Sequence, residues 1–289
     1  MPYVPAAVST GFRVLSAAAP PLAVRAAARA FWHVGPPVPV RAADRPVHDH
    51  ARRGTVRLGE ERLATYRWGD ADAPAVLLVH GWQVRASRFS SLVTALEGAG
   101  LGVVAFDGVA HGDSTGRRMS ALDQMAAMRV LHDAEGPFAA VVGHSLGGLA
   151  AGLALHDGFA AERFVSLATP PGFDDIAASF LRLAGIPESL HERFCRHVER
   201  TFPGEVSDVR ARIDLVTHPI PTTIPTLFAQ DAGDRMAAPD GAARLHAAHP
   251  GSALLTTQGL GHNRVLDDPA VLEAVVAHVT APRPAAVRG

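Results

Sequence analysis

The chain has 289 residues, 48% of them hydrophobic, and a formal net charge of −1. A chain of this size and composition can bury the core of one large α/β domain, and its near-neutral charge provides no electrostatic footprint for nucleic acid or an anionic membrane. Its single cysteine, Cys195, and its lack of lysine exclude an intrachain disulfide, Schiff-base catalysis and a lysine-dependent phosphate-binding loop.

The same composition indicates the cellular compartment of the protein and the kind of genome that encodes it. One cysteine in a chain of this length is typical of a reducing compartment, so we expect a cytoplasmic protein. The bias toward Ala, Gly, Pro and Arg indicates a GC-rich bacterial coding sequence. No run is long and apolar enough to span a membrane, and the segment Met1 to Gly35 lacks the uninterrupted apolar core of a signal peptide.

The first 50 residues differ from the rest of the chain. Met1 to Gly35 is rich in alanine and predicts a short amphipathic helix, which either packs on the body of the protein or lies weakly on a membrane surface. Gly35 to Pro46 is rich in proline and predicts a linker. We therefore assign residues 1–50 to an N-terminal helix and linker, and residues 51–289 to the main domain.

From residue 55 onward, apolar runs with the length of strands come first as a hairpin and then alternate with helical patterns. The predicted strands are Thr55 to Leu58, Leu63 to Trp68, Ala75 to Val79, Val103 to Phe106, Phe138 to Val142, Arg163 to Ala168, Pro225 to Ala229 and Ala253 to Thr257. The predicted helices are Phe89 to Ala99, Leu122 to His132, Leu146 to His156, Gly241 to Ala248 and Pro269 to Val279. This alternation predicts a mostly parallel, doubly wound sheet covered by helices on both faces.

The interval of about residues 170–224 interrupts this rhythm. It has no clear strand, but it has two apolar helical faces, formed by Ile176, Phe180 and Leu183 and by Leu190, Phe194, Val198 and Phe202. We expect two or three helices inserted as a cap over the carboxyl ends of the strands, where ligands bind in such sheets. Most of these side chains should pack on the body, and a few should line an acyl-sized pocket.

The central motif is Gly143-His144-Ser145-Leu146-Gly147-Gly148, between a predicted strand and a predicted helix. A Gly-x-Ser-x-Gly sequence in this position is typical of a nucleophile elbow, in which a strained turn exposes the serine hydroxyl. The helix that follows points its free N–H groups toward the same place. Ser145 is therefore the predicted nucleophile.

A serine hydroxyl needs a base within hydrogen-bond reach, and the base needs an acid to orient it. Of the 15 histidines, His262 is the predicted base, because it follows the last strand in a glycine-flanked loop expected to be exposed. His80, His111 and His144 also lie near strand ends, but their glycine turns suggest structural positions.

Two carboxylates, Asp231 and Asp234, follow the strand that ends near Ala229. Asp234 is the preferred acid, because the residues after it resemble an Asp-x-x-x-Pro turn, although the proline comes one residue later, at Pro239. Asp231 is the alternative acid, and Asp174 and Asp175 are more distant candidates.

Backbone N–H groups must stabilise the oxyanion of an acyl-transfer reaction. Leu146, directly after the nucleophile, is expected to supply one donor. Trp82, in the loop Val79-His80-Gly81-Trp82 after the first long parallel strand, is expected to supply the second.

Together these motifs resemble the α/β-hydrolase superfamily, in its serine esterase-like branch. The resemblance covers about Thr55 to Val279 and rests on Val79-His80-Gly81-Trp82, Phe106-Asp107 through Ala110-His111-Gly112-Asp113-Ser114, the Gly143 to Gly148 motif, the Asp231/Asp234 turn and Gly261-His262. The order Ser, Asp, His is the order of that superfamily. His111 to Ser114 matches a family turn that is usually architectural.

The resemblance implies a serine hydrolase that cleaves an ester or related acyl bond through an acyl-enzyme, acts on a small acyl substrate and needs no cofactor. Alternatives are acyl transfer, lyase or perhydrolase chemistry with the same triad, and a non-catalytic ligand-binding protein. Three histidine groups lack a third ligand at recognisable spacing, so we expect no metal. They are His48-Asp49-His50, His191/His197 and His246/His249.

Overall fold

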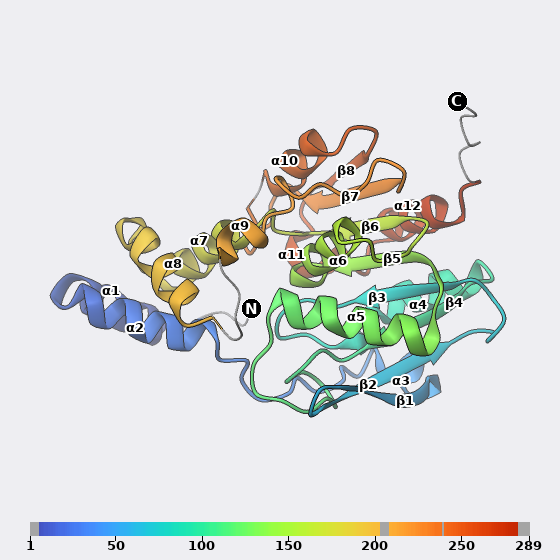
Figure 1. Cartoon of the computed structure of the whole chain (residues 1–289), viewed down its shortest axis with the longest axis horizontal. Helices are drawn as coiled ribbons and strands as arrows, with labels where there is room; N and C mark the ends of the chain where they lie inside the picture. Colours follow the sequence, from blue (N-terminus) through green and yellow to red (C-terminus); the bar gives the residue numbers. More distant parts are fainter. Residues whose placement is uncertain (1–5, 203–207, 239, 283–289) are drawn as a thin grey trace.

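In the computed structural model, which describes residues 6–202, 208–238 and 240–282, eight strands form one sheet (Figure 1). The strands are β1 (Arg52–Leu58), β2 (Glu61–Trp68), β3 (Ala75–Val79), β4 (Gly102–Phe106), β5 (Phe138–His144), β6 (Phe164–Leu167), β7 (Thr226–Asp231) and β8 (Ala253–Thr257). Their order across the sheet is β1-β2-β4-β3-β5-β6-β7-β8. β2 pairs antiparallel with β1 and β4, and every other pair is parallel.

Helices precede the first strand, connect most of the later strands and follow the last one. They are α1 (Ala6–Ala18), α2 (Pro20–Phe31), α3 (Arg45–His50), α4 (Ser90–Gly98), α5 (Ala121–Glu135), α6 (Leu146–His156), α7 (Phe173–Ala184), α8 (His191–Arg200), α9 (Val209–Arg212), α10 (Gly241–Ala248), α11 (Gly261–Arg264) and α12 (Pro269–Thr280), with short 3₁₀ turns at Ala86–Phe89 and Glu188–Leu190. Within the described part of the chain, no helix combines the length and apolar character needed to cross a bilayer.

The sheet separates two hydrophobic cores, because its central strands are apolar on both faces. All five residues of β3 are buried. Leu77 and Val79 join the core that contains α5 and α6, whereas Val76 and Leu78 join the core that contains α4 and α12. The predicted doubly wound, mostly parallel sheet is confirmed, and its carboxyl edge is where β3, β5 and β7 end together.

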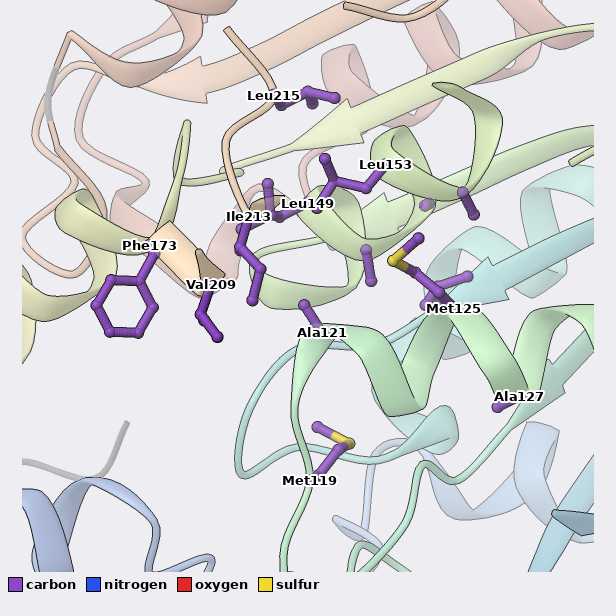
Figure 2. Close-up of a cluster of buried hydrophobic side chains, with 14 of the residues drawn as sticks. Met119, Ala121, Met125, Ala127, Leu149, Leu153, Phe173, Val209, Ile213 and Leu215 are labelled. Atoms are coloured by element: carbon purple, nitrogen blue, oxygen red, sulfur yellow. The ribbon is translucent and has the colours of Figure 1, made fainter. Parts of the chain in front are cut away.

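The cap predicted at about residues 170–224 is helical and lies between β6 and β7. It contains α7, α8 and the short α9, and residues 203–207 of this interval lie outside the described part of the chain. Figure 2 shows cap side chains, among them Phe173, Ile213 and Leu215, beside α5 and α6. Leu215 rests directly on α6, where a Cβ atom added to Gly152 would lie 2.6 Å from its Cδ2 atom.

The N-terminal segment contains two helices where the sequence predicted one, and this is a correction. Pro20 is the first residue of α2 and separates it from α1, because proline has no N–H to continue a helix and keeps the residue before it out of the helical region. α2 lies beside α8 of the cap (Figure 1). The ring of Phe31 at the end of α2 is centred 5.3 Å from Phe180 and 5.5 Å from Phe194.

The short helix α3 begins at Arg45, at the end of the predicted linker. The division of the chain near residue 50 stays a prediction. Through α2, the first 50 residues therefore contact the cap at the carboxyl end of the sheet.

Candidate active site

Ser145 lies between the end of β5 and the first residue of α6. Its backbone has φ 56° and ψ −127°, a conformation that a residue with a side chain adopts only when its surroundings impose it. Its N–H donates to the carbonyl of Leu167, at 2.9 Å. The turn is tight, because a Cβ atom added to Gly143 would lie 2.5 Å from the Cα atom of Gly148. The small residues around the serine are therefore required by packing.

His262 lies next to this serine. Its Nε2 atom is 3.0 Å from Ser145 Oγ, and its Nδ1 atom is 2.8 Å from Asp234 Oδ2. The sequence predicted an exposed loop here, which is wrong: His262 belongs to the short helix α11, and its side chain is only 8% exposed. The carboxylate of Asp234 is fully buried. The geometry forms a continuous hydrogen-bonded chain from carboxylate to imidazole to hydroxyl.

The two acid candidates differ in what they contact. Asp234 accepts hydrogen bonds from the N–H groups of Met236 and Ala237 on Oδ1, which leaves Oδ2 for the imidazole. Asp231 instead accepts hydrogen bonds from Gly233 N, Leu260 N and Thr257 Oγ1. Although burial opposes the ionisation of Asp231, the backbone N–H groups outweigh it and lower its pKa. Asp231 therefore holds the loop before His262, and of these two carboxylates only Asp234 contacts the ring.

The more distant carboxylates, Asp174 and Asp175, lie on the cap helix α7. They form ion pairs with Arg210 and Arg244 at 2.9 and 2.6 Å. Neither is hydrogen-bonded to His262, whose Nδ1 atom has Asp234 as its partner.

The loop after β3 passes directly over the serine. A Cβ atom added to Gly81 would lie 2.8 Å from the Cβ atom of Ser145. Trp82 lines the same cavity as Ser145 and Leu146. Leu146 is the first residue of α6, so helix geometry leaves its N–H without a partner in the helix. The two predicted oxyanion donors therefore belong to segments that flank the hydroxyl.

Two buried histidines fix the conformation of this loop. His80 donates from Nδ1 to the Gly81 carbonyl and accepts from Gly108 N at Nε2, at 2.7 and 2.8 Å. His111 accepts from Gln83 N at Nε2, at 2.9 Å. Burial lowers the pKa of both rings, that of His111 to about 3, so both are neutral at physiological pH. Their contacts support the structural interpretation of these two residues.

His144, for which the sequence suggested a structural position without naming a partner, contacts the predicted base. Its Nε2 atom is 3.0 Å from the backbone carbonyl oxygen of His262, and the two rings are centred 4.9 Å apart. Because a carbonyl only accepts, Nε2 carries the proton. Burial lowers the pKa of His144 well below its ordinary value, so the ring stays neutral. His144 is thus placed to hold the backbone of His262.

Arg88 is a second residue that sequence reasoning missed. It is 8% exposed, and its guanidinium donates to the Asn263 carbonyl at 2.7 Å. It also binds both carboxylate oxygens of Asp267, at 2.8 and 2.7 Å. These bonds connect the 3₁₀ turn before α4 with the helix that carries His262. A bidentate arginine between a turn and the helix that carries the predicted base has no local sequence signature that could have revealed it.

An apolar cavity of about 90 Å³ lies against Ser145 and His262. Besides Trp82, Ser145, Leu146 and His262, its lining comes from four further parts of the chain: the end of α2 (Phe31, Trp32), the loop and helix near Met119–Ala121, the cap (Pro170, Phe173, Ile176, Ser179, Phe202, Ile213) and the segment after β7 (Met236, Ala237). As predicted, only a minority of the cap faces reaches it. The sequence did not predict that the end of α2 lines the cavity. The one signal for it was the aromatic pair Phe31 and Trp32 at the end of an alanine-rich helix.

Among the described residues, the one group of three side chains close enough to share a metal ion is Asp174, His191 and Cys195 in the cap. The carboxylate of Asp174 is already bound by Arg210, with both distances 2.9 Å. Burial raises the pKa of the Cys195 thiol to about 12, which opposes the thiolate that a metal requires. The cluster therefore fits an ion pair beside a buried thiol better than a metal centre.

Comparison with known proteins agrees with this architecture. The model of the alpha/beta hydrolase family matches residues 76–275, which is more than half of the chain. The chain therefore belongs to the alpha/beta hydrolase family, and the resemblance inferred from the motifs is confirmed. At the level of sequence, no curated protein gives a match.

Several solved structures share the fold. A membrane phospholipase A, described as a bacterial virulence factor, has a TM-score of 0.64 and 15% identity, over 93% of this chain and 96% of its own. A proline iminopeptidase-related protein from Thermus thermophilus has a TM-score of 0.63 and 20% identity, over 81% and 100%. An esterase from Pyrococcus furiosus has a TM-score of 0.60 and 20% identity, over 86% and 95%. At these identities the likeness establishes the fold alone.

Proposed function

We propose that this protein is a serine hydrolase that cleaves a carboxylic ester or a related acyl bond through an acyl-enzyme intermediate. The observation that carries the proposal is the hydrogen-bonded chain from Asp234 through His262 to Ser145, at 2.8 and 3.0 Å. It lies against an apolar cavity in a chain of the alpha/beta hydrolase family. The esterase among the structural neighbours is consistent with this chemistry.

In the proposed reaction, Ser145 Oγ attacks the acyl carbon while His262 Nε2 takes its proton. Asp234 orients the ring through Nδ1 and stabilises the imidazolium. The N–H groups of Leu146 and Trp82 stabilise the oxyanion, and each such donor contributes roughly 3–4 kcal/mol to the transition state in comparable sites. The C–O bond then breaks, the leaving alcohol takes the proton from His262, and the acyl group stays on the serine.

Water completes the proposed cycle. His262 removes a proton from a water molecule, the hydroxide attacks the acyl-enzyme, and collapse of the second oxyanion releases the carboxylic acid and returns the proton to Ser145. These steps need no metal or cofactor. The predominantly apolar lining favours an uncharged acyl group. As Cys195 is a free, buried thiol, we place this reaction in a reducing, cytoplasmic setting.

A panel of p-nitrophenyl esters of increasing acyl length tests the proposal. We expect the wild type to hydrolyse them, and Ser145→Ala to lose activity by a factor on the order of 10⁴ or more, by the precedent of serine triads. Ser252→Ala is a matched control, because this serine lies away from the cavity and contacts His246. A folded wild type without activity on any ester, or a Ser145→Ala variant with full activity, would contradict the proposal. If a fluorophosphonate labelled Ser145 but no ester were hydrolysed, a ligand-binding or acyl-transfer role would be favoured.

A further inference from the structure

The N-terminal helices carry most of the large apolar side chains that the described residues expose. Five such side chains are exposed: Val8, Val14, Leu22, Val38 and Leu254. Four of the five lie in residues 8–38, and Val14 and Leu22 are the most exposed, at 65% and 54%. Val8 and Val14 border a shallow apolar depression on α1 itself. An apolar surface concentrated in this way marks an interaction site more often than scattered apolar residues do.

The same segment has a charge unlike the rest of the chain. Residues 1–43 contain no aspartate or glutamate but contain the arginines Arg13, Arg25, Arg29 and Arg41, although the whole chain has a net charge of −1. The first three of these arginines are exposed. The whole-chain charge therefore hides a local positive region.

The packing of α2 leaves the apolar and basic residues on one free face. Ala23, Val24, Ala27 and Ala28 are buried on the side that faces the protein. Leu22, Arg25 and Arg29 are exposed at a spacing of three and four residues, which places them together on the opposite side. In Figure 1 these helices form one end of the molecule beside α8, away from the sheet.

We propose that the free face of α2, together with the exposed Val8 and Val14 of α1, docks on an anionic lipid surface. Exposed Val and Leu side chains can enter the boundary between headgroups and acyl chains, while arginines contact anionic headgroups, and this combination is typical of helices that lie in a membrane interface. The exposed apolar side chains next to these arginines disfavour nucleic acid as the occupant, and the exclusively positive charge disfavours a second copy of the same face.

The position of this face also bears on the substrate. Phe31 and Trp32 at the end of α2 line the cavity next to Ser145. Docking would therefore bring that cavity close to a lipid surface, which points to acyl chains of lipids as the substrate class. This last step rests on the proposed function, whereas the docking itself does not.

Sedimentation with vesicles tests the docking. We expect the 289-residue chain to bind vesicles of phosphatidylcholine with phosphatidylglycerol, to bind pure phosphatidylcholine vesicles at least tenfold more weakly, and to be released by salt. Val14→Asp with Leu22→Asp should lower vesicle affinity at least tenfold without changing turnover of a water-soluble ester. Arg25→Gln with Arg29→Gln should lower it by about fivefold for each arginine removed.

Two control variants test whether vesicle binding depends on this face. One controls for vesicle binding by any exposed apolar side chain, and the other controls for catalysis. Leu254→Asp changes an exposed apolar residue of β8 and should bind vesicles as the wild type does. Ser145→Ala should also bind vesicles normally, so that a failure of the proposed catalysis cannot be mistaken for a failure of docking. Docking is overturned if the wild type does not bind anionic vesicles, or if the Val14 and Leu22 changes leave binding intact. It is also overturned if the wild type is a dimer that does not bind vesicles and Val14→Asp with Leu22→Asp makes it monomeric, because the face is then a dimer interface.

Discussion

At the scale of single residues, the backbone of Ser145 carries the most distinctive feature of the site. A φ of 56° at a serine costs of order 1–3 kcal/mol, and it persists only where neighbouring structure fixes it. Here the fixing comes from the Leu167 carbonyl and from close approaches at Gly81 and Gly143. The result is a hydroxyl held toward His262 and the cavity instead of one that rotates freely on a regular helix.

The two carboxylates near the site permit a matched comparison. Asp234→Asn should lower kcat by about 10⁴-fold, as the corresponding change does in another serine triad, because the amide no longer accepts the Nδ1 proton in the required orientation. Asp231→Asn should keep most activity but lower the free energy of unfolding by about 1–3 kcal/mol, since one acceptor for the loop before His262 is lost.

Steady-state kinetics and urea unfolding of both variants measure these effects. If Asp231→Asn loses activity as severely as Asp234→Asn while remaining folded, the assignment of the acid is wrong.

Sequence reasoning reached the residues whose chemistry follows from local motifs. Ser145, His262 and Asp234 each follow a strand that ends at the carboxyl edge, so their proximity follows from the topology of a parallel sheet. His144 and Arg88 were not recognised, because their partners are backbone carbonyls of His262 and Asn263, far along the chain. A hydrogen bond between distant segments leaves no periodicity or spacing to detect.

At the scale of elements, the position of α11 depends on Arg88. We expect Arg88→Met, which keeps most of the apolar stem, to lower kcat about ten- to a hundredfold with a smaller change in KM, because His262 would lose part of its alignment. Arg129→Met is the control, since Arg129 is exposed and pairs with Asp157 far from the site.

The kcat and KM values of both variants on one ester are the measurement. An equal loss in the two variants, or a pure KM effect in Arg88→Met, would mean that Arg88 does not position the base.

Element boundaries were predicted best where the chain marks them locally. β3, α6, α10 and β8 match the predicted ranges at both ends. β3 is a fully buried strand, glycines stand at or beside the ends of the two helices, and the mostly exposed β8 lies between Gly251 and Gly259. The break between α1 and α2 was missed although Pro20 marks it. The docking of α2 on the cap could not be predicted, because it depends on aromatic contacts such as Phe31 with Phe194.

At the scale of the whole molecule, several buried histidines connect stability to pH. Burial lowers the pKa of His80, His111 and His144 in the folded chain, that of His111 to about 3. In the unfolded chain these groups return to a pKa of about 6.5. Below that pH the unfolded chain binds protons that the folded chain does not. The contribution of these histidines to the free energy of unfolding is therefore fully present above pH ~6.5. It is lost as the pH falls from there toward the pKa of each histidine in the folded chain.

As the pH falls through this range, each such histidine should lower the free energy of unfolding by up to about 1.4 kcal/mol per pH unit. We expect His111→Gln, in which the amide oxygen can still accept from Gln83 N, to be less stable than the wild type at pH 7.5. The difference should then narrow as the pH falls from 6.5 to 5. Urea unfolding at a series of pH values measures it, and a difference that stays constant down to pH 5 would contradict the account.

In the proposed reaction, Ser145 is a nucleophile activated by His262. Mass spectrometry of the intact protein after treatment with a fluorophosphonate tests it most directly, followed by peptide mapping. We expect a single adduct on the peptide that contains Ser145, with none on folded Ser145→Ala. A folded wild type that remains unlabelled, or an adduct that forms equally on Ser145→Ala, would contradict it.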